Sequence, residues 1–272
     1  MQVGVFAKTF PGTEPAGVLA AVRDAGFAVT QFNLACAGLP SMPDAVPVEA
    51  IRAIEAAAEA SGVALVALSG TYNMAHPDRA VRDDGLRRLA LVIEAAARLS
   101  TPLVTLCTGT RNPDDQWAHH PDNADPSAWA DMAREMEKAL EIAERHGVDL
   151  GIEPEQANIV TSAADATRLI AEMGSKRLRV VLDPANLFEQ ADAVQARAIV
   201  ADAVERTAGQ VAMAHAKDRF ADGRFATAGH GVVDFADFIT RLKRAGFDGP
   251  LVTHGLSAEE APGVARFLKG LV

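Results

Sequence analysis

Eight apolar segments of strand length recur along the 272-residue chain, and a longer segment with helical spacing separates each from the next. The apolar segments are 3–7, 29–35, 64–69, 103–107, 149–153, 178–183, 210–216 and 250–254. The intervening segments are rich in Ala, Leu, Glu and Arg, with apolar residues three and four positions apart. Continuous apolar strands separated by helices are typical of a covered parallel sheet. Eight such units predict one α/β domain over residues 1–272, a single (β/α)8 or TIM barrel.

Glycines mark the expected ends of several helices. A glycine just beyond a helix C-terminus is favoured, because it adopts the left-handed conformation that ends the helix. The glycines that stand a few residues before an apolar segment are Gly26, Gly62, Gly147 and Gly246. The competing arrangement is an open, doubly wound sheet, whose first strand-to-helix turn ordinarily carries a GxGxxG motif. The turn here, KTFPGTEPAG, has no such motif, which favours the closed barrel.

Composition limits the classes of function. With 49% hydrophobic and 23% charged residues, the chain has enough apolar side chains for a large core. A net charge of −10 disfavours binding to nucleic acid, because phosphate backbones are normally bound by clusters of Lys and Arg. No apolar run reaches about 18 residues, and no basic leader opens the chain, so we expect a cytoplasmic protein without a membrane segment. Cys36 and Cys107 are expected to be buried free thiols.

Four consecutive apolar segments end in a polar residue that can bind a metal. These residues are Glu153, Asp183, His215 and His254. In a barrel, the chemistry is carried by residues at the C-terminal ends of the strands. Because the four positions lie about one strand-helix unit apart, we expect their side chains to meet at one rim of the barrel.

Two carboxylates and two imidazoles suit Mn, Zn, Co or Fe better than Mg, which prefers oxygen ligands. One divalent ion is therefore the expected cofactor. Each residue also has an ordinary structural role open to it: a strand-end carboxylate can cap the following helix, and a histidine can be a hydrogen-bonded core residue.

Several longer motifs carry a resemblance to a known family. The motifs are IEPE, VVLDPANL, HAKD, GHGVVDF and GPLVTHGL. Together they resemble the xylose isomerase-like TIM barrel superfamily, which contains sugar isomerases, sugar 3-epimerases, hydroxypyruvate isomerases, keto-inositol dehydratases and endonuclease IV. The resemblance covers essentially the whole chain, and it is specific for the superfamily rather than for one substrate.

The resemblance places Glu153, Asp183 and His215 at three metal-ligand positions of the superfamily. His254 falls at the fourth, where the sugar epimerases carry a glutamate. In those epimerases two metal-bound glutamates face opposite sides of the substrate carbon, one removing a proton and the other returning it. A histidine at 254 disfavours this symmetric scheme. It also leaves the metal with only two anionic ligands. The metal should therefore be a stronger Lewis acid.

Chemistry that needs one base is therefore expected. The metal would hold two adjacent substrate oxygens and stabilise an enediolate, while a nearby base takes the proton. Glu153 is one candidate base, and Glu155 is another because residues two apart point to the same side of an extended strand. Lys217, two residues after His215, is the candidate acid or electrostatic partner. The alternative for Glu155 and Lys217 is a mutual surface ion pair.

Four further residues are candidates for substrate binding: His76, Arg111, Asn186 and His230. Asn186 stands where the related epimerases place a substrate-binding histidine, and otherwise shapes the turn after Asp183. His76 is otherwise a loop residue before Asp78, which can cap the next helix. His230, between two glycines, is otherwise solvated.

Arg111 belongs to a long loop after the fourth apolar segment. The same loop contributes Trp117, His119 and His120. Its charge and aromatic surface suit a lid over a sugar ring or an acid group. The alternative is a simple surface loop.

These features predict a metal-dependent sugar isomerase or epimerase-like enzyme acting on a small polyhydroxylated carbonyl compound. A dehydratase or lyase acting on a keto-sugar or keto-inositol is an alternative that needs no different ligands. An endonuclease IV-like repair enzyme would need further ligands for three metals, and the acidic charge disfavours it. A non-enzymatic metal-binding protein is another class. Homo-oligomers are common among related barrels, but no sequence feature identifies an interface.

Overall fold

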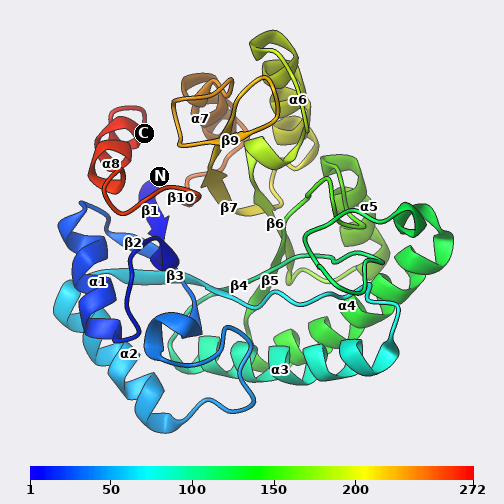
Figure 1. Ribbon diagram of the computed structural model, residues 1–272, viewed down its shortest axis with the longest axis horizontal. Coiled ribbons are helices and arrows are strands. Elements are labelled where there is room, and N and C mark those ends of the chain that lie inside the picture. The colour runs from blue at the N-terminus through cyan, green and yellow to red at the C-terminus, as the bar shows by residue number, and fades with distance from the viewer.

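Eight parallel strands close into a barrel surrounded by helices in the computed structural model, which describes residues 1–272 (Figure 1). The order around the barrel is β1-β10-β7-β6-β5-β4-β3-β2, and β1 closes it by pairing with both β10 and β2. The barrel strands are β1 (Gln2–Phe6), β2 (Val29–Phe32), β3 (Ala64–Ser69), β4 (Leu103–Leu106), β5 (Asp149–Ile152), β6 (Leu178–Leu182), β7 (Val211–Ala216) and β10 (Pro250–Thr253). The predicted TIM barrel is confirmed.

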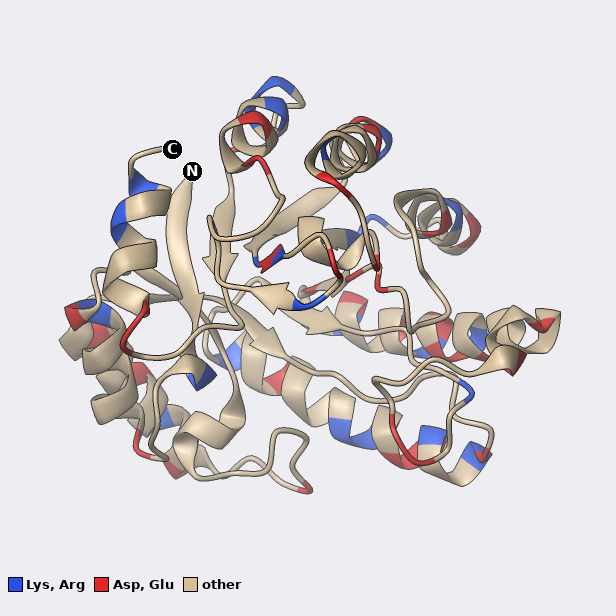
Figure 2. Ribbon diagram, turned by 45° about the horizontal axis from the view of Figure 1, so that its top comes forward, with Lys and Arg blue, Asp and Glu red and all other residues tan.

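The helices cover the barrel with their apolar faces. They are α1 (Pro15–Asp24), α2 (Val48–Ser61), α3 (Arg79–Arg98), α4 (Pro126–His146), α5 (Ala163–Met173), α6 (Ala193–Arg206), α7 (Phe235–Arg244) and α8 (Ala261–Lys269). In α7 the buried residues Phe235, Phe238 and Leu242 recur at helical spacing, whereas its last turn carries basic side chains. Figure 2 shows the same division throughout, with charged residues on the helices and loops and almost none along the strands.

Glycine ends the helices as the sequence predicts. Gly62 and Gly147 are the left-handed C-cap residues of α2 and α4, with φ of 69° and 72°. Gly26 and Gly246 follow the last turns of α1 and α7 and also have positive φ, 95° and 82°. A side chain at these positions would meet the steric cost of the left-handed region, which glycine avoids.

Short elements at the strand ends differ from the expected pattern. The second apolar segment stops being a strand at Phe32, and residues Leu34–Ala37 form a 3-10 turn that Asn33 caps by accepting a hydrogen bond from the amide of Ala35. After β7 the chain adds a hairpin, β8 (Asp218–Arg219) and β9 (Phe225–Ala226), that the sequence did not predict. The remaining 3-10 turns are Ala7–Thr9, Pro121–Ala124 and Pro184–Asn186.

The side chains that point into the barrel are apolar near the N-terminal ends of the strands and polar near their C-terminal ends. Ala67, Leu103, Val181, Met213 and Val252, from five strands, form a separate buried cluster. Side chains two residues further along a strand point to the same side. The next inward layer, toward the C-terminal ends, is therefore polar.

Two further expectations concern thiols and membranes. Cys36 and Cys107 are both free and buried, as expected. None of the helices combines the length and apolar character that crossing a membrane requires.

Candidate metal centre

The four predicted ligand residues come together at the C-terminal rim of the barrel. Asp183, His215 and His254 lie two residues beyond Val181, Met213 and Val252 of the inner apolar cluster. Glu153 follows β5 directly. One ligand atom from each of the four side chains lies within 4.8 Å of the others. The strand register therefore turns four residues that are distant in sequence into one cluster.

Contacts within the cluster pair each imidazole with a carboxylate. His254 Nε2 lies 3.0 Å from Asp183 Oδ2. His215 Nδ1 lies 3.3 Å from Glu153 Oε1 and 3.8 Å from Asp183 Oδ2. The two imidazole rings are 4.5 Å apart between centroids. Two carboxylate oxygens and two ring nitrogens facing one point are a donor set that fits a divalent transition metal or zinc.

The electrostatics of Glu153, Asp183 and His254 favour the protonation states that a cation requires. Burial opposes ionisation of Asp183, but Lys217 and His254 hold the pKa of that carboxyl well below its usual range. Burial also opposes ionisation of Glu153, and His215 lowers its pKa overall. Burial, followed by the neighbouring His215, lowers the pKa of His254. The cluster thus presents ionised carboxylates beside a neutral His254 imidazole. For His215, burial lowers the pKa, but the carboxylates of Glu153 and Asp183 more than offset this and raise it, so a bound cation would take the place of a proton there.

Asn186 and Lys217 extend the cluster on one side. Lys217 Nζ donates to Asn186 Oδ1 at 2.6 Å and lies 3.3 Å from Asp183 Oδ2. Asn186 in turn donates to Glu153 Oε1 at 2.7 Å. Phe225 of β9 covers Lys217, with Nζ 4.2 Å from its ring centroid. Asn186 also occupies the 3-10 turn after Asp183, the structural role considered from the sequence, and it lines the cavity described below, where substrate binding stays a prediction.

Glu155 faces the same cavity without a partner cation. It accepts a hydrogen bond from Asn158 at 3.3 Å, and burial together with the charge of Glu153 raises its pKa to about 7. The structure forms no Glu155–Lys217 ion pair, because Lys217 is turned toward Asp183 and is only 7% exposed. The surface ion pair considered as an alternative for these two residues is therefore wrong.

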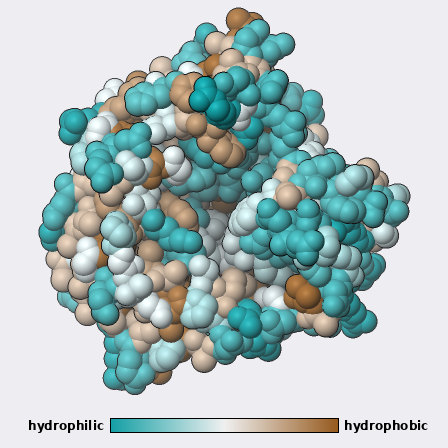
Figure 3. All heavy atoms as spheres, in the orientation of Figure 1, coloured by the Kyte–Doolittle hydropathy of each residue, from teal (hydrophilic) through white to brown (hydrophobic).

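A cavity of about 670 Å³ opens above the cluster. Glu153, Glu155, Asn186, His215, Lys217 and His254 line one part of its wall. The rest of the wall is mostly polar and includes Lys8, Asn33, Ser69, Thr71, Thr105 and Trp117. Figure 3 shows a hollow near the centre of the molecule, bordered by hydrophilic surface. This space suits a small polar molecule with several hydroxyl groups.

Gln31 is a cavity residue that sequence reasoning missed. It is 7% exposed, and its Oε1 lies 2.9 Å from His215 Nε2. Its Nε2 donates to Ser69 Oγ at 3.0 Å and to Thr105 Oγ1 at 3.1 Å. The available signal was a glutamine inside an otherwise buried barrel strand, VTQF, where an uncompensated amide would be costly.

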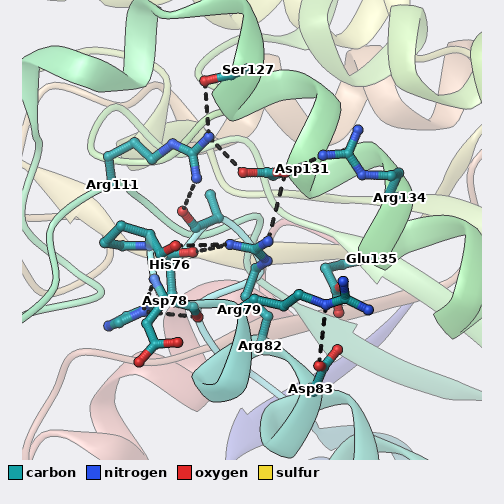
Figure 4. A network of polar contacts seen from close by, with 12 residues as sticks. His76, Asp78, Arg79, Arg82, Asp83, Arg111, Ser127, Asp131, Arg134 and Glu135 are labelled. Atoms are coloured by element: carbon teal, nitrogen blue, oxygen red, sulfur yellow. Dashed lines mark hydrogen bonds and ion pairs between the residues drawn. The ribbon is translucent and has the colours of Figure 1, made fainter.

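Three predicted substrate-binding residues lie outside the cavity wall. His76 Nε2 lies 3.1 Å from the carbonyl of Pro113, and Asp78 beside it caps α3 by accepting from the amide of Ala80. Arg111 binds Asp131 of α4, at 2.7 Å between Nη2 and Oδ2, and the carbonyl of Ala75 (Figure 4). His230 lies in a separate depression beside Glu260.

The residues predicted to form a lid, in the long loop after β4, do not all face the cavity. Trp117 lines the cavity and is half exposed. His120 instead accepts a hydrogen bond from the amide of Asp122, and His119 lies outside the cavity wall. The loop therefore presents one aromatic side chain to the cavity, while Arg111 anchors its base.

Comparison with protein families decides the membership of the chain. The model of the xylose isomerase-like TIM barrel family matches residues 19–270. The chain belongs to this family. A search of the curated proteins finds no significant match.

Solved structures of the same fold include several sugar epimerases. The chain is similar to 3-keto-D-glucoside 4-epimerase from E. coli, with a TM-score of 0.78, 17% identity and 99% of each chain covered. It is similar to D-psicose 3-epimerase from Clostridium cellulolyticum H10, with a TM-score of 0.77, 14% identity, and coverage of 100% of this chain and 99% of the other. A third is L-ribulose 3-epimerase, with a TM-score of 0.76, 20% identity, and 99% and 92% covered. At these identities the likeness establishes the shared fold.

Proposed function

We propose that this family member is a metal-dependent isomerase of the sugar isomerase and epimerase kind, acting on a small polyhydroxylated carbonyl compound. The observation that carries the proposal is the cluster of Glu153, Asp183, His215 and His254 at the floor of a polar cavity. A structural role alone would not require four titratable side chains to converge at the rim where TIM barrels place their active sites. The epimerase activity of the structural neighbours supports the same class of reaction.

The four clustered residues would hold the metal. Mn, Zn, Co or Fe fits the mixed nitrogen and oxygen donors better than Mg. When bound, such an ion supplies positive charge that makes a C–H bond beside a carbonyl more acidic.

The chain's own residues then move the proton. Glu153 or Glu155 takes the proton from the carbon next to the substrate carbonyl, and the same carboxyl group can return it to the former carbonyl carbon, while the proton of the neighbouring hydroxyl group passes to the former carbonyl oxygen. Lys217, held by Asn186 and Asp183, offers positive charge and a donor N–H to the oxygen that becomes negative during this transfer. Because the remaining cluster position is His254, the base is expected to act from one face of the substrate.

Loss of water is a second candidate reaction, and the placement of Glu155 and Lys217 favours it. A dehydratase needs one base for the carbon and one acid for the departing hydroxyl. Glu155 and Lys217 line the cavity as separate groups rather than as an ion pair, so both are available for these roles. A product lighter by one water would identify this reaction.

Two other functions have less support. An endonuclease IV-like enzyme would use a three-metal cluster, whereas the chain has a single group of four side chains able to hold a metal. The net charge of −10 also disfavours DNA. A non-catalytic metal-binding protein would not need the cavity beside the cluster. Cytoplasmic location and assembly into a homo-oligomer stay predictions of the sequence.

The proposal is tested with purified protein loaded with Mn or Zn and incubated with ketoses, keto-acids and keto-inositols in deuterated water. Isomerisation or epimerisation would appear in proton NMR spectra as new sugar signals and as loss of a C–H signal through exchange. Asp183→Asn provides the inactive comparison, and Glu59→Gln, on the exposed face of α2, provides a matched control. Metal-loaded wild type that processes none of these compounds would leave the binding protein as the better reading.

A further inference from the structure

Gln31 joins the opposite wall of the barrel to the metal-ligand cluster. It lies on β2, and its side chain reaches His215 on β7, where Oε1 and Nε2 are 2.9 Å apart. His215 is 3% exposed and Gln31 is 7% exposed, so solvent competes little for this contact. No other protein group lies within hydrogen-bond distance of His215 Nε2. Gln31 is therefore the one protein partner of that nitrogen.

Two hydroxyl groups hold the Gln31 amide at its other end. The amide nitrogen carries two hydrogens. One is donated to Ser69 Oγ on β3 and the other to Thr105 Oγ1 on β4, at 3.0 and 3.1 Å. Ser69 and Thr105 are themselves buried. With both amide hydrogens used on this side, the amide oxygen faces His215.

An amide oxygen can only accept a hydrogen bond, and this decides which ring nitrogen of His215 carries the proton. A neutral imidazole has one N–H donor and one bare nitrogen. If Nε2–H donates to Gln31, then Nδ1 of the neutral ring is bare. Without a cation, the carboxylates of Glu153 and Asp183 favour a second proton on Nδ1, and a bound cation would take the place of that proton. Nδ1 is the atom that lies 3.3 Å from Glu153 Oε1 and 3.8 Å from Asp183 Oδ2, inside the ligand cluster. The lone pair thus points to the position that a cation would occupy.

We propose that Gln31 is a positioning residue that holds His215 in the Nε2–H tautomer, with Nδ1 presented as a metal ligand. The inference rests on the proposed function, since it assumes that the cluster holds a metal. Hydrogen bonds to the second nitrogen of a ligating histidine fix its ring and raise its basicity, and their loss typically costs 10- to 100-fold in affinity, as an order-of-magnitude guide. Ser69 and Thr105 act one step further away by holding the amide.

The first measurement reads the tautomer without any metal. Protein with 15N-labelled histidine is stripped of metal and studied by NMR at a pH where His215 is neutral, and the resonance is assigned by its disappearance in His215→Gln. Wild type should show His215 protonated at Nε2. A proton on Nδ1 would overturn the proposal, because it would mean that the amide presents its NH2 group to the ring. This result does not depend on whether the protein is an isomerase or binds a metal at all.

The second measurement compares variants of Gln31. Gln31→Met keeps the length of the side chain but removes the acceptor, so the tautomer preference should weaken and Zn affinity, from competition with a chromophoric chelator, should fall by about 10- to 100-fold. Gln31→Glu keeps an acceptor and should retain the Nε2–H tautomer. The glutamate variant is judged by its NMR spectrum alone, because its added negative charge would strengthen cation binding by itself. Gln2→Met, at an exposed position of β1, is the matched control.

The outcomes separate positioning from packing. Retention of the Nε2–H tautomer in Gln31→Glu together with its loss in Gln31→Met supports positioning. A side chain that only filled space would not make the tautomer depend on whether an acceptor oxygen is present. Unchanged Zn affinity and tautomer in a folded Gln31→Met overturns the proposal. If Gln31→Met does not fold, Thr105→Val releases one amide hydrogen while leaving Gln31 in place, and an unaltered tautomer balance and Zn affinity there would count against the proposal. Wild type that binds no Zn, with the expected tautomer present, would reject the metal-dependent function and the ligand role of His215 while leaving the Gln31 contact established.

Discussion

His254 Nε2 lies 3.0 Å from Asp183 Oδ2 at the rim of the barrel, where the two residues follow β10 and β6, the strands on either side of β7. Asp183 has no exposed surface, and Lys217 as well as His254 stabilises its negative charge against the cost of burial. The imidazole has a lowered pKa and stays neutral. The carboxylate of Asp183 thus faces Lys217 on one side and two imidazole nitrogens on the other, an arrangement suited to accept a further cation.

Removal of Asp183 should therefore abolish metal binding. We expect the metal content of Asp183→Asn to fall from near one ion per chain to near zero, because the variant loses an anionic ligand at the centre of the cluster. His254→Ala should also lower it, by at least about tenfold in affinity. Elemental analysis after incubation with Mn or Zn measures both. Equal metal content in wild type and both variants, with Glu59→Gln as the control, would reject the site.

Substitution of His254 by glutamate tests whether this position limits the chemistry to one base. His254→Glu would place a third carboxylate in the cluster, facing Asp183, so repulsion should make the metal-free variant less stable than wild type. With metal bound, a second base becomes available and an epimer should appear among the products. The added negative charge should also weaken the metal as a Lewis acid and slow the reaction that wild type catalyses by about tenfold or more. Thermal melting with and without Zn, and product analysis by NMR, provide the readouts.

The neutral variant His254→Gln separates charge from shape in this experiment. It keeps a polar side chain at the position but supplies no base. We expect it to yield no epimer and to be less sensitive to metal removal than His254→Glu. If both variants give the same product mixture, position 254 does not determine the number of bases.

The sequence predicted the barrel and the meeting of the four candidate ligand residues for the same physical reason. Strand alternation and the spacing of strand-helix units carry polar residues such as Asp183 and His215 to one rim, whatever the details of the loops. Contacts made across the barrel follow a different rule. Gln31 and His215 are 184 positions apart, and only the closure of the barrel brings their side chains together.

Loop residues were the hardest to place from sequence. His76 and Arg111 were candidates for substrate binding because they follow barrel strands. The structure uses them instead in backbone contacts and in an ionic network that joins the loops after β3 and β4 to α4.

The hairpin of β8 and β9 was also missed, because its two-residue strands have no periodicity to detect. The carboxylate of Asp218 organises this region by accepting from the amides of Gly229, Gly231 and Val233.

Lys217 should contribute to turnover more than to metal binding. Lys217→Met fills a similar volume but removes the charge next to Asp183 and the donor to Asn186. We expect kcat to fall by about 10²- to 10⁴-fold, the usual range for loss of a proton-transferring group, with metal still bound. Lys217→Arg, which keeps charge but changes shape, should recover only part of the activity. A variant whose kcat is unchanged while KM rises would show that Lys217 only binds substrate.

Asp131 of α4 should be important for stability, because three arginines converge on it (Figure 4). Arg111 contacts it at 2.7 Å, Arg82 lies 3.7 Å away, and Arg134 completes the group. Arg82 and Arg111 are about nine-tenths buried, so Asp131→Asn would leave two buried cations without their carboxylate. We expect a loss of about 3 kcal/mol in unfolding free energy. Asp202→Asn, which removes an exposed pair with Arg206, should have a much smaller effect, because solvent screens this pair.

The stabilising effect of Asp131 should disappear in acid. Burial alone would raise its pKa, but Arg111 and Arg82 more than offset this, and the folded-state pKa lies below the usual value. A carboxyl group with a depressed folded pKa stabilises the protein above its unfolded pKa of about 3.9 and loses this effect as the pH falls through the folded value. Urea unfolding should therefore show a large difference between wild type and Asp131→Asn at neutral pH, and this difference should shrink progressively as the pH falls below about 4. A difference that does not change with pH would mean that Asp131 acts through packing or neutral hydrogen bonds rather than through its charge.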